Sequence, residues 1–224
     1  MGFFDDLIDL LLPERCAGCG REPVLLCSAC LKPLRESARP VRLAPAGLPS
    51  PWTVAAYEGP LRAILAAYKE RGRTALAVPL GEALATAVQA ALTPGPDPPA
   101  AVVAVWVPSG RKAVRRRGHD PLRGLAEVAV RRLRADGVPV TMADALRQRG
   151  GVADQAGLTA VQRAANLHGA VEVRAHVAGS RVVLVDDVVT TGASLAEAAR
   201  ALHAAGADVT GAAAIAATPR RRPR

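Results

Sequence analysis

The chain has 224 residues and a formal net charge of +9; half of its residues are hydrophobic and only 3% are aromatic. This length allows one α/β domain plus a small additional unit, and the apolar content excludes a disordered chain. A basic protein suits polyanionic partners, which here means nucleic acid or a small pyrophosphorylated ligand. No apolar run reaches bilayer length, and the segment MGFFDDLIDLLLP carries acids where a signal peptide carries bases, so we expect a cytoplasmic protein.

Four cysteines, the only ones in the chain, follow a short amphipathic helix predicted over residues 3–12. Their spacing is C-x2-C-x7-C-x2-C, and two such pairs can complete a tetrahedral thiolate shell for structural Zn²⁺. The cytoplasmic setting disfavours disulfides, no thioredoxin-like flanks favour reactive thiols, and iron–sulfur ligation stays open. The predicted ligands are Cys16, Cys19, Cys27 and Cys30.

The next segment, residues 31–51, is rich in Pro and Arg and is predicted to be a connector. A short strand over 52–57 and helices over 61–68 and 76–92 follow. The sequence TPGPDPP at 93–99 can neither be helical nor pair in a sheet, so it predicts a surface loop. A buried strand over 101–107 then ends at Pro108.

A basic loop is predicted over residues 110–120, because five cations fall within seven residues. Such cations repel each other unless an anion lies among them, and a guanidinium fork suits pyrophosphate. A plainly solvated loop remains the alternative. The five residues are Arg111, Lys112, Arg115, Arg116 and Arg117.

An amphipathic helix over 122–133 and an edge strand over 138–142 come next. The block DQAGL at 154–158 precedes Thr159, which can cap a helix. Arg163 and Asn166 lie three residues apart and would share a face of that helix.

The stretch RVVLVDDVVTTGAS, residues 181–194, organises the rest of the chain. Its apolar run over 182–185 predicts a strand buried on both faces, which is typical of a parallel sheet. We expect the strand to stop at Asp186 and Asp187, followed by a turn and a helix over 195–205. Ligands of open α/β sheets bind at the carboxyl ends of such strands.

The turn after that strand predicts a phosphorylated sugar as the ligand. A helix N-terminus offers unpaired N–H groups and a partial positive charge, which suits a phosphate. The two carboxylates would repel a bare phosphate, so they suit sugar hydroxyls or a hydrated Mg²⁺ carried by the ligand. The turn residues are Thr190, Thr191, Gly192, Ala193 and Ser194.

A last strand is predicted over 208–217, and four arginines mark the basic end of the chain at 218–224. The repeated order of strand, helix and strand from residue 101 onward predicts an α/β fold with a doubly wound parallel sheet. We divide the chain into residues 1–34 (helix and zinc knuckle), 35–51 (connector), 52–217 (the α/β domain) and 218–224 (a basic disordered tail).

Residues 182–194 resemble the phosphoribosyl pyrophosphate motif of type I phosphoribosyltransferases: apolar residues, two acids, two variable positions, then Thr-Thr-Gly and a small hydroxyl residue. The resemblance implies that the turn at 190–194 cradles the 5-phosphate and that Asp186 and Asp187 contact the ribose hydroxyls. Receiver domains and Asp-dependent phosphatases also have strands ending in two acids, but they lack Thr-Thr-Gly at this spacing.

Together with the cysteines, three further blocks resemble the ComF family, competence-associated proteins with a zinc knuckle and a phosphoribosyltransferase domain. They are a Lys-x-x-Gly segment at 69–72, a Pro and Arg-Gly loop at 108–118, and a Gln-x-Gly-Leu block at 155–158 with Arg163 and Asn166. The resemblance covers residues 16 to about 217. It implies that Lys69, Arg115, Arg116 and Arg117 bind pyrophosphate.

The chain departs from that family at Arg-Gly-Phe-Asn-Gln, which is here Arg-Gly followed by His119, Asp120 and Pro121, and at Trp106, which replaces a proline. A lone loop histidine is more often a polar surface residue than a base. Amidophosphoribosyltransferase has an N-terminal cysteine nucleophile, whereas this chain begins Met1-Gly2-Phe3, so we exclude glutamine-dependent chemistry.

The resemblance implies an enzyme that binds phosphoribosyl pyrophosphate with Mg²⁺ and transfers ribosyl 5-phosphate to an unnamed nucleophile. A non-catalytic alternative is a DNA-uptake accessory protein that binds single-stranded DNA or competence proteins and senses the sugar diphosphate. A third reading is a ligand-responsive regulator of nucleotide genes.

Overall fold

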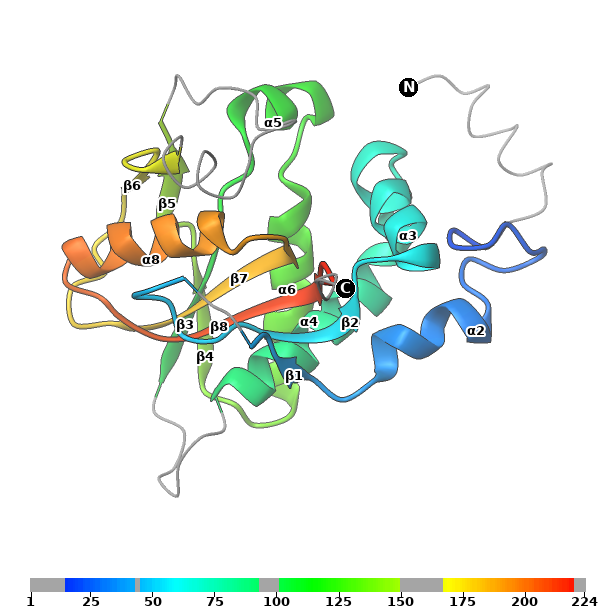
Figure 1. The fold of residues 1–224 in the computed structure, drawn as a ribbon, viewed down its shortest axis with the longest axis horizontal. Helices are drawn as coiled ribbons and strands as arrows, with labels where there is room; N and C mark the ends of the chain where they lie inside the picture. The colour runs from blue at the N-terminus through cyan, green and yellow to red at the C-terminus, as the bar shows by residue number, and fades with distance from the viewer. Residues whose placement is uncertain (1–14, 43–44, 93–100, 150–166, 220–224) are drawn as a thin grey trace, which may run out of the picture.

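A computed structural model of the chain describes residues 15–42, 45–92, 101–149 and 167–219. The helix predicted over 3–12, the loop over 93–99, the block over 154–166 and the arginines of the tail lie outside these residues. The central feature is a six-stranded sheet of order β1-β2-β8-β7-β3-β4 (Figure 1). Its strands are β1 (Arg39–Pro40), β2 (Trp52–Ala56), β3 (Val102–Trp106), β4 (Val140–Ala143), β7 (Arg181–Val189) and β8 (Asp208–Ala217).

The sheet is parallel from β2 to β4, and β1 alone pairs antiparallel. The chain passes from β3 outward to β4 at one edge, and from β7 outward to β8 in the opposite direction. The strand order therefore reverses between β3 and β7, which lie side by side. This confirms the predicted doubly wound parallel sheet and locates its topological switch point.

Helices cover both faces of the sheet. Helices α4 (Ala77–Leu92) and α6 (Pro121–Ala135) pack together on one face, and α8 (Ala193–Ala204) covers the other (Figure 1). Helix α3 (Gly59–Glu70) follows β2 beside the carboxyl ends of the strands. Because β7 lies between these layers, its run over 182–185 is almost fully buried, as the sequence predicts.

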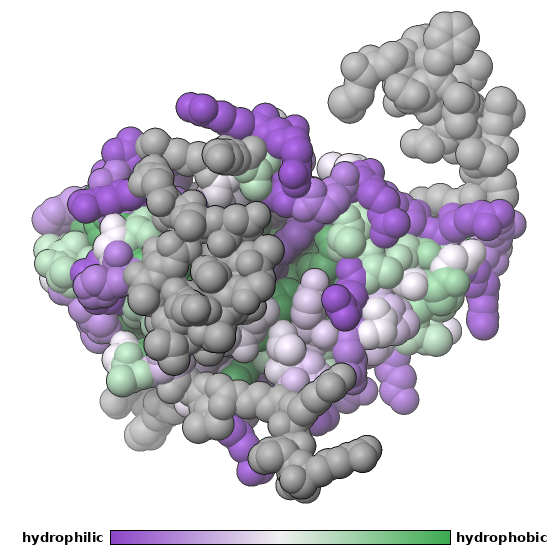
Figure 2. Space-filling view, turned by 45° about the horizontal axis from the view of Figure 1, so that its top comes forward, coloured by the Kyte–Doolittle hydropathy of each residue, from purple (hydrophilic) through white to green (hydrophobic). Residues whose placement is uncertain are grey.

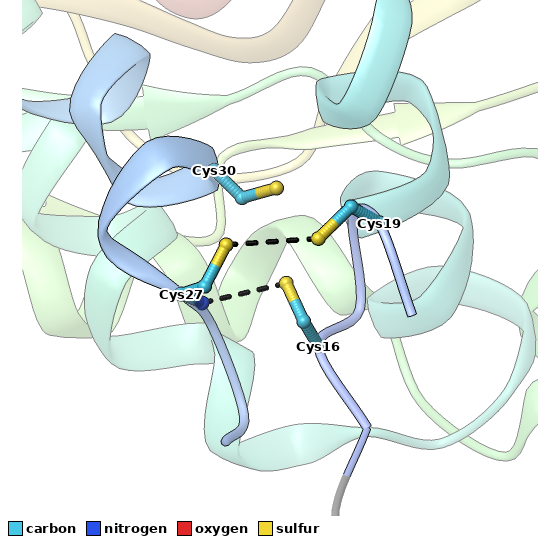
Figure 3. A group of neighbouring side chains, drawn as sticks. All are labelled: Cys16, Cys19, Cys27 and Cys30. Carbon is cyan, nitrogen blue, oxygen red and sulfur yellow. Dashed lines mark hydrogen bonds between the residues drawn. The ribbon is translucent and has the colours of Figure 1, made fainter. Parts of the chain in front are cut away.

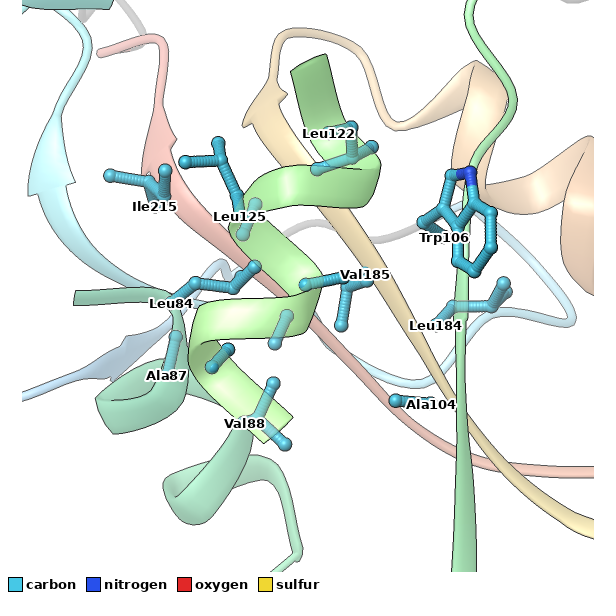
Figure 4. Close-up of a cluster of buried hydrophobic side chains, with 14 of the residues drawn as sticks. Leu84, Ala87, Val88, Ala104, Trp106, Leu122, Leu125, Leu184, Val185 and Ile215 are labelled. Atoms are coloured by element: carbon cyan, nitrogen blue, oxygen red, sulfur yellow. The ribbon is translucent and has the colours of Figure 1, made fainter. Parts of the chain in front are cut away.

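The core is built from small and branched aliphatic side chains. Figure 4 shows Leu122 and Leu125 of α6 and Leu84 of α4 gathered around Val185 of β7. Burying one such leucine contributes roughly 1.5–3 kcal/mol. Strand β8 presents alanines to both layers, and a Cβ on its Gly211 would lie 3.2 Å from the Ala91 carbonyl oxygen of α4. The small residues of β8 thus allow a close approach of helix and sheet.

Helix α4 and the short 3-10 turn before it, η2 (Thr74–Leu76), form an apolar stretch. By length and composition alone this stretch of 19 residues, with a mean hydropathy of 1.5, could cross a membrane, which departs from the expectation that no apolar run reaches bilayer length. Half of its window is buried inside the fold. That burial is typical of the core helix of a globular domain.

Two predicted boundaries are wrong. The basic segment is not a loop: residues 111–117 form helix α5 (Arg111–Arg117), which begins after Gly110 and ends at Gly118 in the left-handed conformation. Arg and Lys are good helix formers, and no proline interrupts them. Strand β7 does not stop at residue 185 but continues through both aspartates to Val189, because its end still pairs with β8 up to Ala217.

The structure also contains elements that the sequence does not predict. Strands β5 (Leu146–Gln148) and β6 (Val171–Val173) form a separate antiparallel pair. The connector holds a 3-10 turn, η1 (Lys32–Arg35), and the short edge strand β1. Helix α2 (Ser28–Leu31) begins directly after Cys27. The buried cysteines belong to the same continuous apolar cluster as the sheet.

Candidate functional site

The predicted ligand-binding turn lies at the switch point of the sheet. Strand β7 ends at Val189, and the chain turns through Thr190 and Thr191 to Gly192, the N-cap of α8. The neighbouring strand β3 ends beside it, since the Val107 N–H donates to the Val185 carbonyl oxygen (2.9 Å). The carboxyl ends of β3 and β7 therefore meet where α/β sheets place their ligands.

The turn itself has the geometry of an anion site. Gly192 has φ +78°, a left-handed conformation that suits glycine, and the Ala193 N–H donates to the Thr191 hydroxyl (3.3 Å). The first helical hydrogen bond of α8 runs from Ala196 to Gly192 (2.9 Å). The N–H groups before Ala196 lie in the first turn, where a helix offers donors and a partial positive charge to a ligand.

Gly192 is buried, and its neighbour is a residue of the connector. A Cβ at Gly192 would lie 2.9 Å from Cδ of Pro45. The segment after β1 therefore lies against the turn at 190–194. Nothing in the sequence signals this contact, since 147 residues separate the two positions.

The two aspartates of β7 have different surroundings. Asp187 forms an ion pair with Lys69 from the last turn of α3, and the side chains of both residues are mostly buried. The Asp186 carboxylate accepts a hydrogen bond from the Asp187 N–H (2.8 Å). The predicted ligands Lys69 and Asp187 thus lie together, although 118 residues separate them along the chain.

The pKa values of Asp186 and Lys69 follow from their burial and from the charges of the neighbouring side chains. Burial, reinforced by the charge of Asp187, raises the pKa of Asp186 to about 8. Burial alone would lower the pKa of Lys69, but the attraction of Asp187 and Asp186 outweighs it and raises the pKa. Lys69 is therefore a stable cation, whereas Asp186 holds a proton near neutral pH.

The basic helix α5 does not present all its cations freely. Arg116 donates to Glu70 (2.9 Å), and Arg117 forms a second ion pair with the same carboxylate. The hydrogen bond from Arg117 and the nearby guanidinium charges hold the pKa of Glu70 below its usual range. Glu70 is thus the anion that lies among these cations. The one feature of the sequence that points to Glu70 is its position next to Lys69. Arg115 is exposed.

The segment after β3 is fixed to the start of α6. The Ser109 hydroxyl donates to Asp120 (2.8 Å), and the same carboxylate caps α6 by accepting from the Leu122 N–H (3.1 Å). Tyr68 of α3 donates to the Pro121 carbonyl oxygen (2.9 Å). Burial, with the charges of Asp120 and Glu127, raises the pKa of Tyr68 to about 12, so it remains a donor at neutral pH.

A cavity of about 820 Å³ opens between this segment, α5, α6 and β5. Its lining combines cations, acids and one indole, and includes Trp106, Ser109, Arg115, His119, Asp120 and Arg147. Figure 2 shows a band of hydrophilic surface over the region of α5 and α3. A polar ligand of moderate size fits such a cavity.

The four cysteines form a second, separate cluster. Their sulfur atoms all lie within 4.8 Å of one another, and Cys19 Sγ lies 3.6 Å from Cys27 Sγ, too far for a disulfide (Figure 3). Tetrahedral zinc with Zn–S bonds of 2.3 Å needs sulfur separations of about 3.8 Å. The cluster therefore fits a four-thiolate zinc site, as the spacing predicts.

Hydrogen bonds already favour thiolate in part of this cluster. Burial opposes ionisation of Cys16, but backbone N–H groups, including that of Cys27 (3.4 Å), outweigh it and lower the pKa to about 6. A backbone N–H of Cys30 is the main cause that lowers the pKa of Cys27. Burial and the neighbouring sulfur atoms raise the pKa of Cys30, which would need a metal ion to become thiolate.

The Gln-x-Gly-Leu block at 155–158, with Arg163 and Asn166, lies outside the described residues. In the sequence this block lies between strands β5 and β6, which pair with each other. Strand β5 lines the cavity with Leu146, Arg147 and Gln148.

Comparison with known proteins adds one finding. The family model described as the phosphoribosyl transferase domain matches residues 114–224, from within α5 to the end of the chain. The match includes β7, its two aspartates and the turn that follows. No curated protein matches the chain.

Proposed function

We propose, from the premise that residues 114–224 are a phosphoribosyltransferase domain, that the protein binds phosphoribosyl pyrophosphate and transfers its ribosyl 5-phosphate to a nucleophile. The observation that carries the proposal is the pairing of Lys69 with Asp187 beside the turn at the switch point. Lys69 would serve the leaving diphosphate, the Asp187 carboxylate the sugar and the N–H groups of the following turn the 5-phosphate, and this pairing supports such a division of roles.

The roles follow from charge. The N–H groups and hydroxyls at 190–194 would hold the 5-phosphate, and the carboxylates of Asp186 and Asp187 would face the ribose hydroxyls. A Mg²⁺ ion carried by the substrate would neutralise diphosphate charge, and carboxylate oxygens suit its coordination. Lys69 and the arginines of α5 would stabilise the departing pyrophosphate.

The reaction breaks the bond between ribose C1 and the diphosphate oxygen, whose electrons leave with pyrophosphate, while the nucleophile forms a new bond at C1. Positive charge develops at the ribose carbon in the transition state. The Asp187 carboxylate nearby would stabilise that charge electrostatically, whereas the protonated Asp186 would contribute hydrogen bonds rather than charge. The cavity beside Ser109 and Asp120 would admit the nucleophile, and its mixed lining supports a polar acceptor.

Calorimetry tests the binding step. We expect Mg²⁺-dependent binding of phosphoribosyl pyrophosphate, weakened tenfold or more when Asp187→Asn and Thr191→Ala are combined. Thr86→Ala is a matched control, because the Thr86 hydroxyl donates to the Glu82 carbonyl oxygen on the exposed side of α4. Unchanged affinity in the double variant would refute the site.

A non-catalytic function is the second candidate: a DNA-uptake accessory protein that binds single-stranded DNA or competence proteins. The net charge of +9 and the exposed side chain of Arg116 in α5 favour it. Steeply salt-dependent DNA binding, together with no pyrophosphate release against a panel of bases and amines, would support this function over the enzyme.

The remaining assignments belong to the same proposal. The four cysteines would hold structural zinc within residues 1–34, residues 35–51 would connect this unit to the phosphoribosyltransferase domain at 52–217, and residues 218–224 would be a tail. ComF-family membership and a cytoplasmic location are consistent with the four-cysteine cluster and the phosphoribosyltransferase domain.

A further inference from the structure

The loop that carries Cys16 and Cys19 contacts both ends of helix α3. At the first turn of α3, a Cβ on Gly18 would lie 3.0 Å from Pro60 Cβ and 2.8 Å from Cys30 Sγ. Space between the cysteine cluster and the helix is therefore closed. A shift of this loop has to be accompanied by a shift of α3.

Beyond the last turn of α3, Arg73 makes the second contact. Its side chain donates to the Arg15 carbonyl oxygen (2.7 Å), one residue before Cys16. Its backbone N–H donates to the Ala67 carbonyl oxygen of α3 (3.2 Å). Arg73 thus links the start of the cysteine loop directly to the end of the helix.

The same end of α3 supplies the charges of the candidate site. Lys69 pairs with Asp187, and Glu70 pairs with Arg116 and Arg117 of α5. Because a helix is a stiff element with a rise of about 1.5 Å per residue, the position of its first turn is transmitted to its last. The cysteine cluster and the sugar site thus share one rigid support.

The connector provides a second route between the two sites. After η1 the chain pairs as β1 with β2, with Arg39 opposite Thr53. It then reaches Pro45, which lies against Gly192 in the turn before α8. The unit with the cysteines is therefore attached to both halves of the candidate site, the lysine side and the phosphate side.

We propose that metal binding by the four cysteines sets the position of α3 and thereby controls how tightly the site holds phosphoribosyl pyrophosphate. The inference rests on the proposed function for its ligand. A bound zinc ion fixes the loop around Gly18, which keeps Lys69 in reach of the diphosphate. Loss of the ion releases α3 and weakens the site. Arg73 is a positioning residue in this scheme.

The test compares the zinc-loaded protein with the same protein after chelation, with zinc content measured for each. We expect zinc removal to weaken phosphoribosyl pyrophosphate binding about fivefold or more, within the range of allosteric coupling. Reciprocally, the sugar diphosphate with Mg²⁺ should raise the zinc affinity by the same factor. Hydrogen exchange over residues 59–70 should accelerate when zinc is removed.

Two variants distinguish coupling from general damage. Arg73→Ala retains all four cysteines but cuts the link to Arg15, so its zinc-loaded form should bind the sugar diphosphate more weakly and depend less on zinc. Arg71→Ala is the matched control, because Arg71 donates to the Ala63 carbonyl oxygen of α3 itself (3.1 Å). It should show the full zinc dependence.

An equal zinc dependence in Arg73→Ala and Arg71→Ala, or unchanged exchange over 59–70 after chelation, would overturn the coupling. If the zinc-loaded protein fails to bind phosphoribosyl pyrophosphate at all, the proposed function fails. The exchange measurement then still decides whether the cysteine cluster controls α3.

Discussion

Asp186 is held where its negative charge is disfavoured, which makes the stability of the protein depend on pH. Its pKa rises from 3.8 to about 8 on folding because of burial and the adjacent Asp187. Between these values the folded state binds one more proton than the unfolded state. The free energy of unfolding should therefore fall as the pH rises, by up to about 1.4 kcal/mol per pH unit from this group.

Asp186→Asn removes this dependence and keeps an oxygen that can accept from the Asp187 N–H. The difference in the free energy of unfolding between the variant and the natural protein should grow in favour of the variant from pH 4 to pH 8. Above pH 8 the difference should stay constant. Urea unfolding at pH 5, 6.5 and 8, without divalent metal ions, measures the difference. Asp208→Asn, at the exposed start of β8, is the control. If the free energy of unfolding of Asp186→Asn varied with pH in parallel with that of the natural protein, the raised pKa of Asp186 would be contradicted.

Gly192 combines a left-handed backbone with a close neighbour, so its replacement should affect both stability and ligand binding. Gly192→Ala would strain a φ of +78° and press on Pro45. We expect a loss of about 1–3 kcal/mol in the free energy of unfolding and weaker binding of phosphoribosyl pyrophosphate.

Gly137→Ala provides the comparison for that prediction. Its φ is +82°, but no atom lies within 4 Å of the added Cβ. It should therefore lose backbone stability with no change in ligand affinity, as thermal unfolding and calorimetry would show. Equal affinities in the two variants would contradict the role of the turn.

The departure from the family pattern at residues 119–121 has a local explanation. Asp120 caps α6 and holds Ser109, while Pro121 occupies the first turn of the helix, where its missing N–H costs nothing. These two residues therefore serve the helix start that supports the segment after β3. His119 lies exposed at the cavity.

At the scale of elements, one buried carboxylate joins helix α8 to the strand pair β5 and β6 through a hydrogen bond. Glu197 of α8 is 5% exposed, accepts from the Val171 N–H of β6 (3.3 Å) and pairs with Arg200 (2.7 Å). Burial would raise the pKa of Glu197, but these hydrogen bonds outweigh it and lower the pKa. The strand pair is thus anchored to helix α8, which begins at the turn at 190–194.

Glu197→Ala should leave the Val171 N–H and Arg200 without this acceptor, which costs about 1–3 kcal/mol. Urea unfolding measures the loss, and hydrogen exchange at 146–148 and 171–173 should accelerate. Glu127→Ala removes an exposed pair with Arg123 on α6 and should change stability by less than about 0.5 kcal/mol. A similar small effect for Glu197→Ala would show that α8 does not anchor the strands.

The strands and long helices could be predicted because their periodicity is local. The buried run of β7, the alanine-rich β8 and the amphipathic helix α6 all carry their pattern within about 15 residues. The sequence predicts a loop in place of helix α5, because the cations of α5 repel each other unless Glu70 is close, and Glu70 lies 46 residues before Arg116 in the chain. Strands β5 and β6 are three residues each, too short for an alternation to stand out.

For the whole molecule, the motif at residues 182–194 predicts the turn at 190–194 and the two aspartates at the end of a strand. It does not predict which residues surround them. The pairing of Lys69 with Asp187, the position of Pro45 over Gly192 and the link from Arg73 to Arg15 depend on three-dimensional packing. No periodicity marks such contacts. The spacing of the cysteines, in contrast, specifies their cluster by itself, because both pairs must converge on one centre.

If the proposed function holds, the ion pair between Lys69 and Asp187 also governs the order in which metal and substrate would bind. A divalent ion approaching alone must expel a mostly buried ammonium group and leave it uncompensated, at a cost on the order of a few kcal/mol. Under the proposed function, a sugar diphosphate would deliver a replacement anion together with the metal and so make the exchange favourable. We therefore expect the free protein not to bind Mg²⁺ at cellular concentration. It should bind Mg²⁺ only together with the sugar diphosphate.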